Sequence, residues 1–289
     1  MKPAPFEYHA PESLSDVTAL LAEHGDEAKV LAGGQSLVPM LALRLTRFEH
    51  IVDLNRVDDL RGVSRANGTL TVKAMTTQRT VEHDADAGAA VPLLAQAIPL
   101  IGHFQIRNRG TVGGSIAHAD PASELPAVAL ALDAELEVAG PGGTRTVPAS
   151  EFFVGTWTTT IGEDEILAAV HFPVWSDGAG FAVEEVARRS GDFALTGVVA
   201  AVEVDGSGIV SRAGLSFLGM GPTPVRARQA EEALVGTAPT AAELEEIGRL
   251  AVADTEPTAD VHASAEYRKH VGAHLVVRAL DRALGAARG

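Results

Sequence analysis

Two pairs of adjacent glycines, each followed closely by a serine, are the residues of this chain best suited to hold a ligand. The candidate binding residues are Ala32, Gly33, Gly34, Gln35 and Ser36 in a first glycine segment, and Thr111, Val112, Gly113, Gly114 and Ser115 in a second. Adjacent glycines lack the Cβ atoms that keep bulky groups away from the main chain, and they permit positive φ. Successive N–H groups can then converge on one anion. The two segments predict a ligand with two phosphates, or with one phosphate and a polar linker.

The polar residues near the second glycine segment allow more than one interpretation. Arg107 and Arg109 could reach a pyrophosphate, or they could be solvated surface arginines. His118 and Asp120 have ligand chemistry for a metal, but a single histidine beside a glycine loop is more often a hydrogen-bond partner. The chain has no H-E-x-x-H motif, so no metal site is predicted.

Several common active-site motifs are missing from the chain. It contains neither the dinucleotide fingerprint G-x-G-x-x-G nor the phosphate loop G-x-x-x-x-G-K-[ST]. Neither Ser36 nor Ser115 lies in G-x-S-x-G, which argues against a hydrolase.

Composition narrows the possible functions further. The 289 residues carry a formal net charge of −15 and no cysteine. The absence of cysteine excludes disulfides, a thiolate nucleophile and any iron–sulfur cluster held by cysteines of this chain. The sequence shows no cluster of basic residues of the kind that binds nucleic acid. No apolar run is long enough to span a membrane. The start of the chain lacks a secretory signal, so we expect a cytoplasmic protein.

The elements around the first glycine segment form a small α/β unit. A helix is predicted over 11–25 and short apolar strands over 29–32 and 51–54. The apolar stretch 37–45 predicts a buried helix that begins directly after the glycines, with Pro39 in its first turn. A strand, a glycine loop and a helix N-terminus in this order are typical of phosphate sites.

The rest of the chain predicts a second sheet and then a separate C-terminal unit. Asn67-Gly68 indicates a hairpin. The other expected elements before a boundary at 174–180 are helices at 77–81 and 91–101, an apolar helix that residues 121–126 lead into and that runs through Leu132, and strands at 135–138 and 165–172. Beyond the boundary we expect strands at 181–188, 197–204 and 213–218, and helices at 224–235, 240–253 and 265–287. Strands followed by helices favour an antiparallel sheet with helices on one face.

These pieces resemble the FAD-binding medium subunit of molybdenum hydroxylases. Residues 32–39 and 111–126 carry the resemblance, and it extends to 188–193 and 267–270, so it covers nearly the whole chain. This family contains the carbon monoxide dehydrogenase medium chain, the nicotine dehydrogenase flavoprotein subunit and the flavin domain of xanthine dehydrogenase.

The resemblance implies an α+β fold in two parts. Residues 1–175 would form the two-part FAD-binding fold of the vanillyl-alcohol-oxidase (PCMH) type, with sub-domains at about 1–55 and 56–175. Residues 176–289 would form an α+β C-terminal domain.

The same resemblance assigns roles to individual residues. The two glycine segments would bind FAD, mainly its pyrophosphate, through main-chain N–H groups. Glu124, and with it Asp120, would contact the ribityl chain or the flavin. Phe193 would lie over the isoalloxazine, where some relatives have tyrosine, and Ile101 and Leu167 would be apolar neighbours of the flavin. No residue of this chain is expected to be a catalytic acid or base.

The implied function is electron transfer within a larger enzyme. A large subunit would hold the molybdopterin cofactor, a small subunit would hold two [2Fe–2S] clusters, and the complex would be a dimer of heterotrimers. This chain would receive electrons from a cluster and pass them to an external acceptor. Some relatives carry a lysine near the positions of Glu184 and Glu185. Two carboxylates there would not favour an anionic reduced flavin, which leaves the electron acceptor open. The substrate, whether carbon monoxide, an aldehyde, a purine or an N-heterocycle, is also open.

Two other functions compete with this one. A stand-alone flavin oxidase of the vanillyl-alcohol type would usually need a longer chain with a substrate-capping domain. A non-catalytic binding module would use the glycine segments only as turns.

Overall fold

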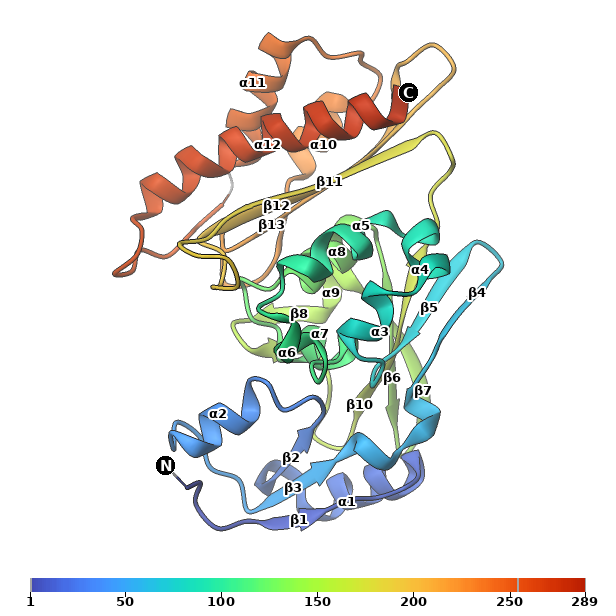
Figure 1. Cartoon of the computed structure of the whole chain (residues 1–289), viewed down its shortest axis with the longest axis vertical. Helices are drawn as coiled ribbons and strands as arrows, with labels where there is room; N and C mark the ends of the chain where they lie inside the picture. Colours follow the sequence, from blue (N-terminus) through green and yellow to red (C-terminus); the bar gives the residue numbers. More distant parts are fainter. Residues whose placement is uncertain (1, 254, 289) are drawn as a thin grey trace.

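The computed structural model describes residues 2–253 and 255–288. Figure 1 shows three tiers stacked along the long axis of the molecule, which we call the lower lobe, the middle tier and the upper tier. The lower lobe consists of β1 (Glu7–His9), α1 (Leu14–His24), β2 (Ala28–Leu31), α2 (Leu37–Ala42) and β3 (His50–Asp53). Its three strands pair in parallel in the order β1-β3-β2.

Helix α1 begins and ends where its sequence directs. Ser13 caps it by accepting a hydrogen bond from the main-chain N–H of Asp16, and Gly25 ends it with a φ of 51°. Val17 and Leu21 lie one helical turn apart on the same face and are both buried. The helix predicted over 11–25 is therefore confirmed.

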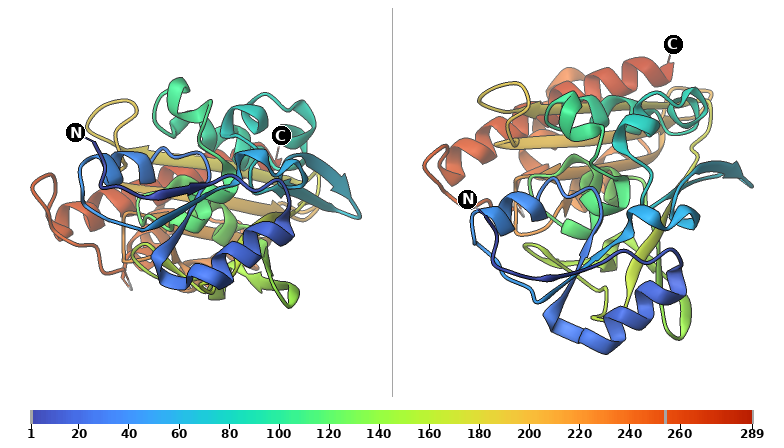
Figure 2. Two further views of the ribbon diagram at one scale, coloured as in Figure 1. Left: turned by 90° about the horizontal axis from the view of Figure 1, so that it is seen from below. Right: turned by 60° about the horizontal axis from the view of Figure 1, so that its bottom comes forward.

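Helix α2 differs from the expected buried helix over 37–45. It has only six residues, and Leu41 is its one buried residue. Val38, Leu43 and Leu45 are 50, 55 and 71% exposed. The prediction of burial was wrong because this helix lies at the outside of the lower lobe, where only one face has protein to pack against (Figure 2).

The middle tier holds the largest sheet. Its strands are β4 (Val63–Ala66), β5 (Thr69–Lys73), β6 (Glu135–Gly140), β7 (Gly143–Pro148) and β10 (Ile166–Pro173), in the antiparallel order β4-β5-β10-β6-β7, and β8 (Phe153–Gly155) and β9 (Thr158–Thr159) form a separate ribbon. Its helices are α3 (Gln78–Glu82), α4 (Ala85–Ala90), α5 (Pro92–Ala97), α6 (Phe104–Arg107), α7 (Val112–His118), α8 (Glu124–Ala131) and α9 (Ala149–Phe152). Asn67 and Gly68 both have positive φ, as a two-residue hairpin turn requires, so the predicted hairpin is confirmed.

The upper tier is a second antiparallel sheet. Its strands β11 (Ala179–Val186), β12 (Thr196–Val204), β13 (Val210–Leu218) and β14 (Val225–Arg226) pair in chain order, and its helices are α10 (Arg228–Leu234), α11 (Ala241–Ala251) and α12 (Ala265–Arg288). The helices cover one face, as predicted. The other face packs on α5 and α8 of the middle tier (Figure 1). Burial on both faces explains why β12 is an almost continuous apolar run.

The helix predicted over 224–235 is shorter and starts later than expected. Val225 and Arg226 form β14 and pair with Phe217 and Ser216 of β13. The Arg226 guanidinium donates hydrogen bonds to Glu231, Asp133 and the Leu130 carbonyl. This anchored arginine holds the chain extended, so that Pro224 does not start a helix.

The contact between β11 and α12 makes a specific prediction about stability. A Cβ on Gly180 would overlap the Ala283 carbonyl and lie 2.7 Å from the Ala287 nitrogen, whereas a Cβ on Gly285 of α12 would meet no atom within 4 Å. Gly180→Ala should lower the free energy of unfolding by about 1–3 kcal/mol through overpacking. Gly285→Ala should raise it by about 0.5–1 kcal/mol by favouring the helix. Urea denaturation of both variants measures the two opposite changes, and equal effects would contradict this packing.

Candidate functional site

The two glycine segments lie against each other. A Cβ on Gly33 would overlap the Arg109 carbonyl and lie 2.7 Å from the Cα of Gly110. A Cβ on Gly114 would lie 3.2 Å from the Cβ of Ala32. The chain can approach itself this closely only because glycine occupies these positions. Two stretches nearly eighty residues apart therefore form one site.

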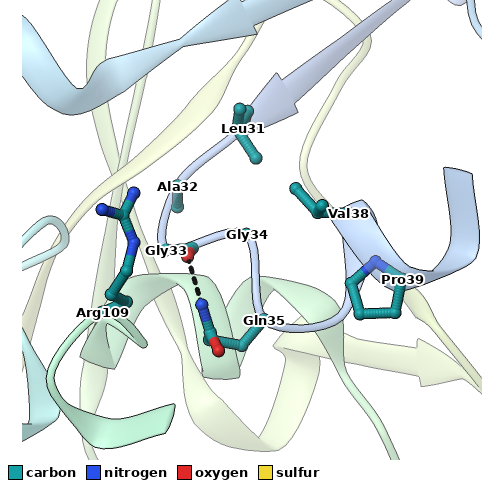
Figure 3. A pocket seen from close by; sticks show the side chains of 8 residues that line it. All are labelled: Leu31, Ala32, Gly33, Gly34, Gln35, Val38, Pro39 and Arg109. Atoms are coloured by element: carbon teal, nitrogen blue, oxygen red, sulfur yellow. Dashed lines mark hydrogen bonds between the residues drawn. The ribbon is translucent and has the colours of Figure 1, made fainter. Parts of the chain in front are cut away.

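A cavity of about 340 Å³ opens beside the first glycine segment. Figure 3 shows its lining residues, which are Leu31, Ala32, Gly33, Gly34, Gln35, Val38, Pro39 and Arg109. The Gln35 side-chain amide donates a hydrogen bond of 3.0 Å to the Gly33 carbonyl. Arg109 is the only charged side chain of this lining, and in Figure 3 it extends alongside Ala32. The cavity therefore combines an apolar wall with one cation.

The first glycine segment has main-chain donors to offer. In the described part of the chain, the N–H groups of residues 33–36 donate to no protein acceptor. Gly34 has a φ of 74°, a conformation that other residues rarely adopt. Main-chain N–H groups without a partner are a ready site for an anion. This agrees with the expectation for residues 32–36.

The second glycine segment is built differently from the expected loop. Residues 112–118 are helix α7, and neither Gly113 nor Gly114 has positive φ. The N–H groups of residues 112–115 already donate hydrogen bonds, to the carbonyls of Thr76 and Ala74 and to the hydroxyl and carbonyl of Thr111. The expectation that this segment binds through its main-chain N–H groups is therefore wrong for residues 112–115, because the helix cap and the sheet use those groups. Its glycines instead allow close packing, with Gly113 pressed on Ala74.

A hydrogen-bond chain in the lower lobe orients the first glycine segment. The Asn55 amide donates to the Ala32 carbonyl at 3.1 Å and to Asp53 at 2.6 Å. Tyr8 donates its hydroxyl proton to the other oxygen of Asp53 at 2.6 Å, and this bond raises the pKa of Tyr8. Because C=O and N–H point in opposite directions across a trans peptide, holding the Ala32 carbonyl turns the Gly33 N–H away from Asn55. Sequence reasoning missed this support, since Asn55 and Tyr8 belong to no motif.

The two arginines before the second glycine segment have separate roles. Arg107 is buried, and its guanidinium donates to both carboxylate oxygens of Glu82 at 3.0 and 3.1 Å and to the carbonyls of Ile101 and Gly102. The hydrogen bonds from Arg107 to the Glu82 carboxylate lower the pKa of Glu82. Both interpretations of Arg107 were wrong, because it is neither solvated nor near the cavity. Arg109 lines the cavity, which agrees with the ligand-binding alternative.

A loop of the upper tier approaches the middle tier near Ile101. Gly191 in this loop has a φ of 85°, and a Cβ there would overlap the ring of His103 within 2.8 Å of its Nδ1. Phe193, two residues later, is 67% exposed. Ile101 is partly buried against the middle-tier core, to which Leu167 of β10 also belongs. The structure thus brings the loop of Phe193 close to the segment of Ile101, while Leu167 is an interior residue.

Asp120 follows α7 and is held by two donors. It accepts hydrogen bonds from the Trp157 indole at 3.2 Å and from the Ala122 main chain at 2.9 Å. The Trp157 ring stacks on His118, with centroids 6.3 Å apart, and burial lowers the pKa of His118. Asp120 is thus a hydrogen-bond acceptor in the fold, whereas His118 contacts Trp157 through its ring.

Three glutamates, two on β11 and one on α8, differ in environment. Glu184 points to α12 and pairs with Arg278 at 3.0 Å and with Arg282. Glu185 lies next in β11, and its buried Oε2 has no hydrogen-bond partner in the described chain. Glu124 is only 7% exposed at the start of α8. Burial raises the pKa of Glu124 to about 8 and that of Glu185 to about 7, and the nearby charge of Glu185 adds to the effect on Glu124.

Comparison with known proteins identifies the family. The family model described as the FAD binding domain in molybdopterin dehydrogenase matches residues 4–175. The chain belongs to this family. A second model, the CO dehydrogenase flavoprotein C-terminal domain, matches residues 181–283. The fold is therefore an FAD-binding domain followed by a C-terminal domain, as the sequence resemblance implied.

Individual relatives agree over the full length of the chain. The carbon monoxide dehydrogenase medium chain of Hydrogenophaga pseudoflava is 38% identical, with 98% of each chain covered. The 6-hydroxypseudooxynicotine dehydrogenase complex subunit alpha of Paenarthrobacter nicotinovorans is 39% identical, covering 100% of this chain and 97% of that one. The solved carbon monoxide dehydrogenase from Hydrogenophaga pseudoflava superposes with a TM-score of 0.97 at 40% identity, over 99% of both chains. This chain is thus the flavoprotein component of an oxidoreductase of the molybdenum hydroxylase family. None of the helices among the described residues is long and apolar enough to cross a membrane.

The buried carboxyl of Glu124 predicts a pH dependence of stability. Its pKa is about 8 in the fold against 4.5 in the unfolded chain, so between these values the folded state binds more protons. The free energy of unfolding should therefore fall as pH rises through this window. The glutamine side chain of the Glu124→Gln variant cannot ionise. The free energy of unfolding of this variant, relative to that of wild type, should therefore rise across the window by a few kcal/mol, which is on the order of the free-energy equivalent of the pKa shift.

Urea denaturation of the flavin-free chain at about pH 5 and about pH 8 tests this expectation. Glu151→Gln, which changes an exposed glutamate, is the matched control and should follow wild type. If Glu124→Gln also followed wild type at both pH values, Glu124 would not hold a proton in the fold.

Proposed function

We propose that this chain binds one FAD at the junction of its two glycine segments and transfers electrons from the [2Fe–2S] clusters of a partner subunit to an external acceptor. The observation that carries the proposal is the set of main-chain N–H groups at residues 33–36 that find no acceptor in the part of the chain that the structure describes, beside the cavity that Arg109 lines. Oriented amides and a guanidinium are the groups that bind a diphosphate. The apolar remainder of the lining suits the non-polar parts of a nucleotide.

The two glycine segments divide the work of binding. Residues 32–36 would donate their N–H groups to the pyrophosphate, with Asn55 holding the peptide that starts the segment. Residues 111–115 would form the opposite wall, where the partly exposed Gly114 and the Ser115 hydroxyl can meet the ligand. Gly33 and Gly114 keep the two walls close enough to serve one ligand.

The flavin end would lie where the upper tier meets the middle tier. Phe193 would offer an exposed ring face there, and Ile101 would offer apolar surface backed by the core to which the buried Leu167 belongs. Asp120 and Glu124 would offer polar contacts. Bound FAD supplies the redox chemistry, and the protein supplies position and electrostatics. Near neutral pH the carboxyl of Glu124, with its pKa of about 8, would be mostly protonated and a neutral hydrogen-bond donor. It would then add little negative charge beside a group that accepts electrons.

The remaining parts of the proposal concern the assembly. The partners would be a large molybdopterin subunit and a small iron–sulfur subunit, assembled as a dimer of heterotrimers. Within this chain, the FAD-binding domain would end at residue 175 and the C-terminal domain would begin at residue 176. Support comes from the relatives, whose names are those of medium chains and of complex subunits. The cytoplasm remains the expected compartment.

The substrate of the assembly belongs to the partner that holds molybdenum. Relatives of similar identity are named for carbon monoxide, 6-hydroxypseudooxynicotine and caffeine. Such different substrates combined with one medium-chain fold indicate that this chain does not select the substrate. The similarity to medium chains over the full length also disfavours a stand-alone oxidase, and the free N–H groups disfavour a module in which the glycines are only turns.

Gly33→Ala should abolish FAD binding while the fold is retained. Gly33 does not have positive φ, so the added methyl acts only by overlapping the Arg109 carbonyl and forcing the two segments apart. Flavin absorbance after reconstitution with FAD and desalting measures binding, and circular dichroism measures the fold. Gly88→Ala is the matched control, because its Cβ would be in ordinary contact with Ala95 at 3.5 Å. If Gly33→Ala retained FAD as wild type does, the proposed seat of the diphosphate would be wrong.

Arg109→Ala should weaken FAD binding by about tenfold or more, since a charge-assisted hydrogen bond contributes about 1.5–3 kcal/mol. Affinity for adenosine diphosphate should fall by a similar factor and affinity for riboflavin should not, because only the diphosphate faces the guanidinium. Fluorescence titration gives the three affinities. Equal losses for riboflavin and adenosine diphosphate would place Arg109 away from the phosphates.

The electron-transfer part is tested in the assembled complex. When the three subunits are co-expressed and given the substrate of the molybdenum subunit, the flavin should be reduced after the iron–sulfur clusters. Stopped-flow absorbance separates the two events. A complex with the Gly33→Ala chain should still reduce its clusters and fail to pass electrons to the acceptor. Undiminished turnover in that complex would show that electrons leave by another route.

A further inference from the structure

Three histidines from three different elements meet in the lower lobe, away from the glycine segments. His9 ends β1, His24 ends α1 and His50 begins β3. Each of the three residues is partly buried, and one nitrogen of each lies within 4.8 Å of one nitrogen of both others. The His24 and His50 rings stack with centroids 3.7 Å apart, and the His9 ring lies 5.3 Å from His50 and 5.4 Å from His24. In Figure 1 these elements lie together at the foot of the molecule.

The spacing of the nitrogens is that of metal ligands. Nε2 of His9 and Nδ1 of His50 are 3.1 Å apart. Two nitrogens on a tetrahedral zinc ion lie about 3.3 Å apart, because each Zn–N bond is about 2.0–2.1 Å long. The His24 ring has no hydrogen-bond partner among the residues that the structure describes. A small rotation of this ring about its side-chain bonds would turn a nitrogen toward the other two.

The surroundings favour a cation at this point. His24 lies in the last turn of α1, where the helix presents its unpaired carbonyls and the negative end of its dipole. The Glu7 carboxylate lies 3.6 Å from Nδ1 of His50 and is free to move, since its side chain is largely exposed. Three neutral imidazoles and one carboxylate, or one water, form a complete tetrahedral set for zinc.

Sequence reasoning predicted no metal site, because these histidines are separated by 15 and 26 residues and form no motif. Parallel pairing creates the cluster by placing Glu7 opposite His50, which puts His9 within reach of the same point. Another pair, His270 and His274 on α12, has the four-residue spacing of many metal sites, with ring centroids 4.8 Å apart. That pair is exposed and offers only two ligands, so it serves as an internal comparison.

We propose that His9, His24 and His50 form a binding site for a divalent cation of the zinc class. The ion would join β1 to the end of α1 and the start of β3, and so fasten the N-terminal strand to the lobe. β1 has only three residues and pairs with a single neighbour, β3, so it gains most from such a link. The site does not depend on bound flavin, and it stands or falls independently of the proposed function.

The test uses the full chain after treatment with a chelator, titrated with zinc in competition with a chromophoric indicator. The variant His270→Gln/His274→Gln should bind one zinc ion per chain with the affinity of wild type. His9→Gln, His24→Gln and His50→Gln should each weaken that binding about tenfold or more, because even the loss of a group that only orients a ligand costs about 10–100-fold. Zinc should also raise the melting temperature of wild type by more than that of the His50→Gln variant.

Cobalt(II) gives an independent readout of geometry. In the His270→Gln/His274→Gln variant it should show the intense visible bands of tetrahedral coordination. Weak octahedral bands, or zinc binding that vanishes with His270 and His274, would overturn the proposal. Zinc affinity unchanged in the His50→Gln variant would do the same. If a substitution in the cluster prevents folding, the cobalt spectrum of the His270→Gln/His274→Gln variant decides, because its cluster is intact.

Discussion

The approach of Gly33 to the main chain at Arg109 and Gly110 is the constraint on which the site depends. It brings the lower lobe within van der Waals distance of the middle tier and leaves no room for a side chain. The N–H groups of residues 33–36 have no protein acceptor of their own in the described chain, and Gly33, Gly34 and Gln35 line the adjoining cavity. The charge of Arg109 lies beside the same cavity, because the main chain of Arg109 is the part of the middle tier that Gly33 approaches. Donor groups, cation and cavity thus follow from one backbone contact.

The structure separates two uses of glycine that look alike in the sequence. In the first segment glycine gives access to the main chain, and Gly34 adopts a conformation closed to most residues. In the second segment Gly113 and Gly114 are ordinary helical residues whose N–H groups are already paired, and their small size lets α7 lie on the sheet and face Ala32. In the proposed function, similar motifs would therefore perform complementary tasks, with one segment donating to the ligand and the other closing the space around it.

Much of the architecture could be predicted from the sequence, because hydrophobic periodicity, caps and turns act locally. Ser13 and Gly25 bound α1, and Asn67-Gly68 makes its hairpin. The prediction errors arose where residues far apart in the sequence determine the local structure. Helix α2 is apolar yet exposed, because burial depends on what packs against it. Strand β14 replaces a helical turn because Arg226 is anchored by Glu231 and by two groups more than ninety residues away, the Leu130 carbonyl and Asp133. The hydrogen bond from Asn55 to the Ala32 carbonyl and the histidine cluster could not be predicted from the sequence for the same reason. Parallel strand pairing creates both, and no sequence spacing marks them.

The contact of Gly191 with His103 has a consequence for the modularity of this fold. The loop that carries Phe193 belongs to the C-terminal sheet, yet its path is set by a ring from the N-terminal half. The two halves therefore share one surface and are not independent cassettes. A chimera that grafted the C-terminal half of a distant homologue would have to import a compatible residue at position 103 along with the loop. Exchange between lineages, by recombination or in the laboratory, is thus expected to favour whole subunits over halves.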